Sequence, residues 1–473
     1  MKTYPVYLNG DFVCTEEVFP VINPATGEML AKMSAVDRER VAQALADAQT
    51  AFVTWRTVTA KSRGEFLFRI ADQLEHRRPE IARVITLESG KPLAQSLGEV
   101  VMAVAHLRWF AEEGRRAYGR VVPPMVDGKR HLVIKSPVGV VGAISPWNFP
   151  LMLAVRKVAP ALAAGCPVVL KPSELTPLTA VALAECIDAA KPVPGIFQLV
   201  MGAADEIARE FAVNPHCRKI SFTGSTAIGR KLISYAARTT KPLLLELGGH
   251  APALVFDDAD LYPAVDGVVL SKFRNTGQSC VAANRIYVQR GLYEPFLKTL
   301  VSRVVQLKLG DGLEQNTDLG PLINRAAVER AAEHVEDALR GGARVLCGGN
   351  PVGCPGNFFE ATVLADVPRD SLCMMEETFA PIAPVCVFDT EEEAVELANR
   401  TSSGLASYVF TRDLARAFRL MDTLEAGIIA INDGLPTTSQ APFGGLKQSG
   451  WGRELGIEGL DAFLETKHIS IGM

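Results

Sequence analysis

Short apolar runs alternate with longer helical stretches from residue 138 onward, and this alternation leaves few folds open to the chain. Runs this short and this apolar are typical of strands buried between two layers of helix. Strands joined by helices form a parallel sheet, and such sheets bind ligands at the carboxyl ends of their strands. We therefore predict an α/β fold with strands in Val138–Ile144, Pro167–Leu170, Phe197–Val200, Lys219–Phe222 and Ala253–Phe256.

Polar residues follow three of these strands, where a bound ligand would lie. Asn148, in a proline-flanked turn, offers an amide donor of the type that stabilises an oxyanion. Gly224–Ser225 suits a phosphate at a helix N-terminus. Beside Lys171, the carboxylate of Glu174 could bind ribose hydroxyls and repel a 2′-phosphate. Purely structural readings stay open: a turn residue for Asn148, a tight turn for Gly224–Ser225 and a helix cap for Ser173–Glu174.

A single cysteine and a single carboxylate stand out in the next part of the chain. Cys280 ends the polar loop Ser271–Ser279, and a loop thiol can be a nucleophile once it is a thiolate. Glu246 lies between two leucines and precedes Gly248–Gly249, and apolar surroundings raise a carboxyl pKa toward neutral. Taken alone, each residue also has an ordinary interpretation, as a small buried hydrophobe and as a paired carboxylate.

The N-terminal region and the tail have different patterns. Asn9–Gly10 predicts a hairpin turn, and three helices follow before Gly119. An extended segment at His131–Lys135 and an alternating one at His468–Ile471 lie outside this helical pattern. An alternating terminal strand must pair with another strand. With 473 residues, two or more domains are expected.

Composition excludes several classes of protein. The net charge of −4 and the scattered basic residues indicate no basic surface of the kind that binds nucleic acid. The nine cysteines form no Cys-x-x-Cys pair and the seven histidines no His-x-x-x-His pair, so we expect neither a disulfide scaffold nor a metal site. No signal-peptide core and no stretch long enough to span a bilayer is present, and we expect a cytoplasmic protein without membrane partners.

Six motifs, in order, resemble the motif set of the aldehyde dehydrogenase superfamily. The match extends from about Asn23 to the C-terminus and is most similar to the succinate-semialdehyde dehydrogenase branch. The motifs are Pro146–Pro150, Lys171–Glu174, Phe222–Ser225, Glu246–Gly249, Gly277–Cys280 and Glu376–Phe379.

The resemblance implies a nicotinamide-dependent oxidation of an aldehyde to its acid. Cys280 would attack the aldehyde carbon, Asn148 and the Cys280 N–H would hold the oxyanion, and Glu246 would activate water against the thioester. NAD is the expected cofactor, with NADP possible. The resemblance places these residues around it: Trp147, Lys171, Ser173, Glu174, Gly224, Ser225, Glu377 and Phe379.

The same branch implies a short aldehyde with an anionic group at its far end. Arg156 and Arg274 would clamp that group, and Thr437 would add a hydroxyl where relatives use serine. Succinate semialdehyde is the first candidate, and glutarate semialdehyde or a sulfonated short aldehyde come next. Lactaldehyde or glycolaldehyde are further alternatives, since Arg156 also suits small hydroxyaldehydes and could instead belong to a solvated helix face beside Lys157. A coenzyme A-acylating enzyme is disfavoured, because that branch generally lacks the carboxylate of Glu246.

The resemblance further implies a Rossmann-like cofactor domain, an α/β catalytic domain and a small β oligomerisation flap. We assign residues 1–118 and 138–247 to the first, 248–445 to the second, and 119–137 with 463–473 to the flap. The expected assembly is a homodimer or homotetramer. Three departures from the family pattern are noted: Ala282 where many relatives carry a second cysteine, and His250 and Ala380 beside the motifs, with no role assigned to His250.

Overall fold

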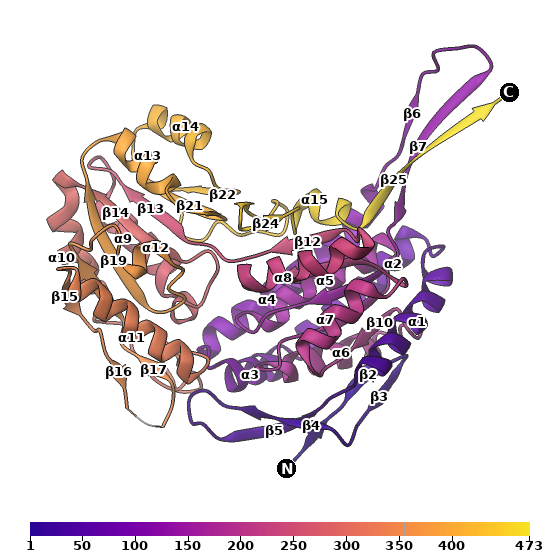
Figure 1. Ribbon diagram of the computed structural model, residues 1–473, viewed down its shortest axis with the longest axis horizontal. Coiled ribbons are helices and arrows are strands. Elements are labelled where there is room, and N and C mark those ends of the chain that lie inside the picture. The colour runs from indigo at the N-terminus through magenta and orange to yellow at the C-terminus, as the bar shows by residue number, and fades with distance from the viewer. Residues whose placement is uncertain (354) are drawn as a thin grey trace.

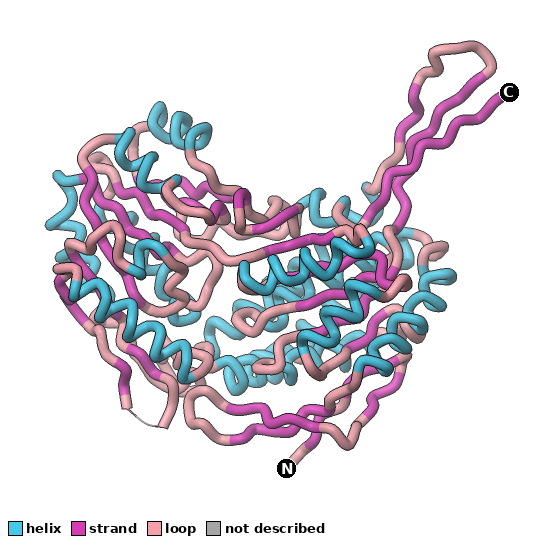
Figure 2. The backbone as a smooth tube through the Cα atoms, in the orientation of Figure 1, coloured by secondary structure: helices cyan, strands magenta, loops and turns pink. Residues whose placement is uncertain are grey.

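A computed structural model describes residues 1–353 and 355–473, so that Cys354 lies outside the described residues. Two α/β bodies lie side by side, and a β arm carrying the C-terminus projects from one of them (Figure 1). Figure 2 shows that each body has strands inside and helices outside. The two bodies correspond to two separate sheets.

The first sheet has eight strands in the order β24-β12-β11-β8-β9-β10-β2-β3. Its five central strands are parallel, and antiparallel strands close both edges. After β8 the chain adds β9 and β10 on one side and then crosses to β11 on the other, which makes the carboxyl end of β8 the switch point where ligands bind. The strands are β2 (Val6–Leu8), β3 (Asp11–Val13), β8 (Val140–Ile144), β9 (Val168–Lys171), β10 (Phe197–Leu199), β11 (Cys217–Thr223), β12 (Leu243–Glu246) and β24 (Gly450–Trp451).

Helices cover both faces of this sheet. One face packs against α1, α7 and α8, and the other against α5 and α6, with α2, α3 and α4 outside them. Three helices were predicted before Gly119 and the structure contains four, each with a buried apolar face. In α1, for example, Val41, Leu45, Ala48 and Trp55 are buried. The bounds are α1 (Arg38–Trp55), α2 (Ala60–His76), α3 (Arg78–Ser89), α4 (Leu93–Glu113), α5 (Pro150–Ala164), α6 (Pro177–Ala189), α7 (Ala204–Val213) and α8 (Thr226–Ala236).

Two buried acids hold the start of the two helices that follow β8 and β9. Glu99 accepts from the N–H groups of Leu151 and Met152 at 2.9 and 3.1 Å, in the first turn of α5. Its other oxygen pairs with the buried Lys91. Glu88 likewise accepts hydrogen bonds from the first N–H groups of α6, those of Leu178 and Thr179. Carboxylates at these positions accept from N–H groups that have no partner within the helix, and their negative charge complements the helix dipole.

The second sheet has seven strands in the order β15-β18-β19-β14-β13-β21-β22, all parallel except β15. Helices α9 and α10 pack on one face, and α11 to α14 on the other. The strands are β13 (Ala251–Val255), β14 (Ala283–Gln289), β15 (Arg344–Cys347), β18 (Thr362–Ala365), β19 (Ile382–Phe388), β21 (Ala406–Phe410) and β22 (Ile428–Ile431). The helices are α9 (Leu261–Phe273), α10 (Tyr293–Val304), α11 (Arg325–Arg340), α12 (Leu372–Met375), α13 (Glu391–Asn399) and α14 (Leu414–Thr423).

The flap is a three-stranded antiparallel sheet in the order β25-β7-β6. It joins β6 (Arg120–Val122), β7 (Lys129–Pro137) and β25 (Leu464–Gly472), and all nine residues of β25 pair with β7. Its strands leave the body of the molecule, as Figure 1 shows at the upper right. Smaller elements complete the chain: β1 (Thr3–Tyr4), β4 (Val18–Ile22), β5 (Met29–Ser34), β16 (Pro351–Val352), β17 (Phe358–Phe359), β20 (Ser403–Gly404), β23 (Leu446–Lys447) and α15 (Gly456–Asp461).

Most of the predicted elements are present. The hairpin turns at Asn9 and Gly10, both with positive φ, as a type I′ turn requires. The terminal strand pairs with the extended segment, a pairing that the sequence did not specify. Several elements were not predicted, among them α4, β19, β21 and β22. Another is β24, which adds to the first sheet from a stretch outside the predicted domains. Among the described residues, no helix is both long and apolar enough to cross a membrane.

Candidate active site

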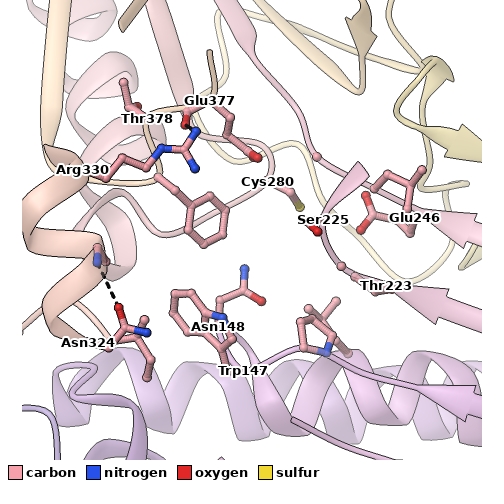
Figure 3. Close-up of a pocket in the computed structure, with 18 of the residues that line it drawn as sticks. Trp147, Asn148, Thr223, Ser225, Glu246, Cys280, Asn324, Arg330, Glu377 and Thr378 are labelled. Atoms are coloured by element: carbon pink, nitrogen blue, oxygen red, sulfur yellow. Dashed lines mark hydrogen bonds between the residues drawn. The ribbon is translucent and has the colours of Figure 1, made fainter. Parts of the chain in front are cut away.

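A cavity of about 360 Å³ opens at the carboxyl ends of β8, β11 and β12, next to the switch point of the first sheet. Asn148, Glu246 and Cys280 point into it from three sides (Figure 3). They come from the turn before α5, the end of β12 and the loop before β14. The structure thus brings together the three residues predicted to be catalytic, although 132 positions separate the first from the last.

The loop that presents Cys280 has a tightly constrained backbone. Asn275, Thr276 and Gly277 all have positive φ, at 51°, 56° and 76°. A side chain on Gly277 would place its Cβ 2.2 Å from the Ala380 carbonyl oxygen. The Asn275 amide donates to the carbonyls of Asn148 and Gln278 at 3.0 and 3.1 Å. A positive φ is unfavourable for a β-branched residue such as Thr276. The surrounding contacts hold the loop in this strained conformation.

Cys280 is half-buried, at the junction of the large cavity with a smaller one. Burial raises the pKa of the thiol well above its usual value, and the carboxylates of Glu246 and Glu377 raise it further. Arg156 acts in the opposite direction. The thiol therefore needs a base to become a thiolate at neutral pH.

Asn148 does not cap its own turn. Its Nδ2 donates to the carbonyl of Gln278, two residues before Cys280, at 3.2 Å. Its Oδ1 is buried without a partner. The amide is thus held beside the thiol, as an oxyanion donor requires.

Glu246 is 2% exposed, and neither of its carboxyl oxygens has a hydrogen-bond partner. Burial raises its pKa to about 8, and the neighbouring carboxylate of Glu454 adds to the rise. Lys157 and Arg156 lower it in part. The ordinary interpretation as a paired carboxylate is therefore wrong, and Glu246 can exchange protons near neutral pH.

Two buried residues of this region were missed by sequence reasoning. Lys157 Nζ lies 2.6 Å from Glu454 Oε1 and 2.7 Å from Thr223 Oγ1. Lys157 and Glu454 are almost completely buried, so the alternative of a solvated helix face at Arg156–Lys157 is also wrong. Glu454 lies 297 residues from its partner, and no local signal in the sequence indicates its burial.

The cavity continues toward the first turn of α8. Ser225 is the N-cap of α8, and its side chain accepts from the Ile228 N–H at 3.4 Å. On the opposite side, Glu377 accepts from the Gly249 N–H at 3.2 Å, and burial raises its pKa to about 7. Trp147 and Phe379 meet edge to face, with ring centroids 5.6 Å apart. These predicted cofactor residues line a single cleft.

Lys171, Ser173 and Glu174 lie farther out, after β9. Lys171 Nζ pairs with Glu174 Oε2 at 2.8 Å and lines a separate cavity of about 200 Å³ beside α7 and α8. The Glu174 side chain is 55% exposed, and Glu88 rather than Glu174 caps α6. Ser173 accepts from the Leu175 N–H within its own turn. The carboxylate of Glu174 is therefore free to meet a ligand on its open side.

A further missed residue connects the thiol loop with the cofactor side of the cleft. Lys272, at the end of α9, is fully buried and donates to Asn284 and Thr378 at 2.6 and 3.0 Å. Burial lowers its pKa to about 7. It fixes the strand that follows Cys280 to the segment that carries Glu377.

The smaller cavity, of about 60 Å³, lies on the other side of Cys280. Arg156, Arg274 and Thr437 all line it, together with Phe149 and Phe443. Arg156 is 2% exposed and stacks over the Phe443 ring at 4.4 Å, while Arg274 lies over the Phe149 ring at 5.1 Å. Neither guanidinium forms an ion pair with a carboxylate in the part of the chain that the structure describes. Two cations therefore face one small space.

A loop cysteine opposite a buried carboxylate, in a cleft that reaches a helix N-terminus, is the arrangement of thiol-dependent aldehyde-oxidising enzymes. The sequence model described as the aldehyde dehydrogenase family matches residues 12–469. The chain belongs to this family, and it is an NAD(P)-dependent aldehyde dehydrogenase.

Individual relatives resemble the chain over nearly its whole length. It is 48% identical over 452 residues to the mitochondrial succinate-semialdehyde dehydrogenase of Arabidopsis thaliana, covering 96% of this chain and 86% of that protein. It is 46% identical over 468 residues to the glutarate-semialdehyde dehydrogenase of Pseudomonas aeruginosa, covering 98% and 97%. The crystal structure of an E. coli NADP-dependent enzyme has a TM-score of 0.98 at 45% identity, covering 100% of this chain and 98% of that one. The predicted fold class is thereby confirmed.

Proposed function

We propose that this dehydrogenase oxidises a short aldehyde whose far end carries an anion, with succinate semialdehyde as the first candidate. The relatives named for succinate and glutarate semialdehydes support this substrate class. Glutarate semialdehyde is one methylene longer, and a sulfonated short aldehyde carries an equivalent anion. These two are the nearest alternatives.

The observation that carries the proposal is the pair of arginines in the smaller cavity. Arg156 and Arg274 come from different elements, yet both line the space next to Cys280. Burial lowers the pKa of each guanidinium, which means that each charge lacks compensation by solvent. A carboxylate or sulfonate bound between them would supply the missing charge through bidentate hydrogen bonds.

The residues around the thiol support a thioester mechanism. Glu246 first accepts the Cys280 proton and passes it on to solvent, and the sulfur attacks the aldehyde carbon to give the oxyanion of a hemithioacetal. The Asn148 amide and the Cys280 backbone N–H stabilise the oxyanion. Glu377 and Phe379 would hold the nicotinamide end of the cofactor, which would supply the hydride acceptor needed to reach the thioester. Glu246 then removes a proton from water, which attacks the thioester and releases the acid and the free thiol.

The cleft suits a dinucleotide. Free N–H groups of the first turn of α8 favour a pyrophosphate, and Glu377 can accept from ribose hydroxyls. Glycine at position 248 allows the backbone to lie close to Glu377, because a Cβ there would lie 2.8 Å from the Glu377 Oε2 atom. The exposed side of Glu174 would disfavour a 2′-phosphate, so we propose NAD as the preferred cofactor.

We also propose the three-part domain division predicted from the sequence, with residues 450–451 added to the cofactor domain. Assembly as a homodimer or homotetramer through the flap belongs to the same proposal. The eight described cysteines are all free, which supports a reducing, cytoplasmic location.

Substitution of Arg274 by alanine tests the substrate. The KM for succinate semialdehyde should rise about ten- to hundredfold, which corresponds to about 1.5–3 kcal/mol for a lost charged hydrogen bond. The KM for butanal, which has the same carbon chain without the carboxylate, should change little. Arg108→Ala, on the surface, is the matched control. Equal losses on both aldehydes would contradict an anion clamp.

A further inference from the structure

The guanidinium of Arg156 is held by neutral groups. Its Nε lies 3.4 Å from His106 Nε2, and a terminal nitrogen lies 3.8 Å from Met152 Sδ. The Phe443 ring covers one face. Of these neighbours, only His106 is a polar acceptor that can fix the direction of the guanidinium plane.

His106 lies on α4 and is completely buried. Its Nδ1 lies 2.8 Å from Ser439 Oγ, on the side away from Arg156. A guanidinium has no acceptor, so Nε2 must be the unprotonated nitrogen that receives the Arg156 Nε–H. Nδ1 then carries the proton and donates to Ser439. Burial, reinforced by the charge of Arg156, lowers the pKa of His106 well below its usual value and maintains this neutral form.

Ser439 belongs to the loop that carries Thr437 into the smaller cavity. The Ser439 carbonyl accepts from the Gly456 N–H at 3.0 Å, which fixes the loop to α15. His106 itself does not line the cavity. It therefore connects two substrate-facing positions, Arg156 and Thr437, from behind.

We propose that His106 is a positioning residue that determines selectivity for anionic aldehydes by orienting Arg156 and fixing the Thr437 loop. This inference rests on the proposed function, since it specifies how one half of the anion clamp is held. Lys157, the next residue on α5, cannot replace Arg156, because its ammonium group is engaged by Glu454.

Two substitutions distinguish the roles of the two ring nitrogens of His106. The asparagine amide ends near the position of Nδ1, so His106→Asn retains a partner for Ser439 and loses the acceptor for Arg156. The glutamine amide reaches the position of Nε2, so His106→Gln restores that acceptor. His216→Asn, on the exposed loop before β11, is the matched control.

The KM for succinate semialdehyde should rise about tenfold in His106→Asn, while kcat and the KM for butanal stay within about twofold. His106→Gln should recover most of the loss. Succinate, which cannot react, should inhibit butanal oxidation less well in His106→Asn and normally in His106→Gln. If His106→Asn does not fold, Ser439→Ala should show the same selective loss, with a smaller amplitude.

The positioning role is overturned if both aldehydes suffer equally, or if glutamine rescues no better than asparagine. Arg156→Ala, measured alongside, separates this failure from that of the substrate class. If Arg156→Ala itself shows no selective loss, the clamp is wrong. If it does and the His106 variants retain full selectivity, only the inference about His106 fails.

Discussion

The carboxyl groups of Glu246 and Glu454 share one buried region with the positively charged Lys157. Lys157 contacts one oxygen of Glu454, while the other oxygen of Glu454 and both oxygens of Glu246 have no hydrogen-bond partner. Ionising both carboxylates in such surroundings is unfavourable, which accounts for the raised pKa of Glu246. The result is a carboxyl group that is mostly protonated at neutral pH and, once ionised, more basic than an ordinary carboxylate.

This arrangement predicts the pH dependence of turnover. Glu246 acts as a base only when ionised, so kcat should rise with pH through the pKa of about 8 and level off above it. Glu454→Gln removes the neighbouring negative charge, which lowers the pKa of Glu246. The rising limb of the kcat profile should therefore move to lower pH, by about one unit.

Stopped-flow and steady-state assays across pH measure this shift. Glu458→Gln, on the exposed side of α15, is the control and should retain the original profile. Glu246→Gln should turn over slowly, and its kcat should no longer rise with pH in this range. A profile that moves to higher pH in Glu454→Gln would contradict the electrostatic explanation.

Glu174 is predicted to set the cofactor preference. Its carboxylate repels a 2′-phosphate, but its own Lys171 partner at 2.8 Å and its 55% exposure weaken that repulsion. We therefore expect only about a tenfold preference for NAD over NADP in kcat/KM, which corresponds to about 1.4 kcal/mol. Glu174→Gln should reduce this preference toward unity. An enzyme that prefers NADP before substitution would refute the assignment.

At the scale of elements, Glu99 explains how α5 is positioned. This helix starts two residues after Asn148 and carries Arg156 and Lys157, and its first N–H groups bond to Glu99. Glu99 is in turn held by Lys91, and both side chains are fully buried. The start of the helix and the positions of Asn148 and Arg156 thus depend on one ion pair.

Removal of Glu99 alone should be costly. Glu99→Leu leaves Lys91 buried and uncompensated, and we expect the protein to lose about 3–5 kcal/mol of stability. The double variant Lys91→Met/Glu99→Leu removes both charges and should recover part of this loss. Chemical denaturation of the two variants measures the difference. A double variant less stable than Glu99→Leu would show that the pair itself supplies net stability.

The sequence was sufficient for elements with a local signal. The short apolar runs and the Asn9–Gly10 turn predicted strands and a hairpin that the structure contains. Contacts between distant residues were not accessible in this way. The pairing of Lys157 with Glu454 and of β24 with β12 depends on how the C-terminal region returns to the first sheet. Burial of a charged residue such as Glu99 has no local signature.

At the scale of the molecule, the flap exposes an apolar surface that the chain itself does not cover. The strand register places Val121, Ile134, Ile469 and Ile471 on the same face of the flap. All four are exposed, Val121 by 76%. This exposed apolar face is where we expect the proposed contact with another copy of the chain.

The assembly should therefore depend on this face and not on the opposite one. Ile469→Asp and Ile471→Asp together should convert the oligomer into monomers, as measured by size-exclusion chromatography with light scattering. Ser470→Asp alters the opposite face of the same strand and should leave the mass unchanged. Monomers already in the unsubstituted protein, or equal effects of the two changes, would contradict the role of this face.

Leu153 and Cys280 are the two residues that line both the large and the small cavity. Every other residue that lines either cavity faces one compartment only. Under the proposed assignment of the two cavities, substitutions at Arg156, Arg274 and Thr437 would change the aldehyde cavity while the cofactor cavity keeps its own walls. A family that diversifies its substrates while retaining one chemistry needs this separation, and here a thiol and one leucine form the partition.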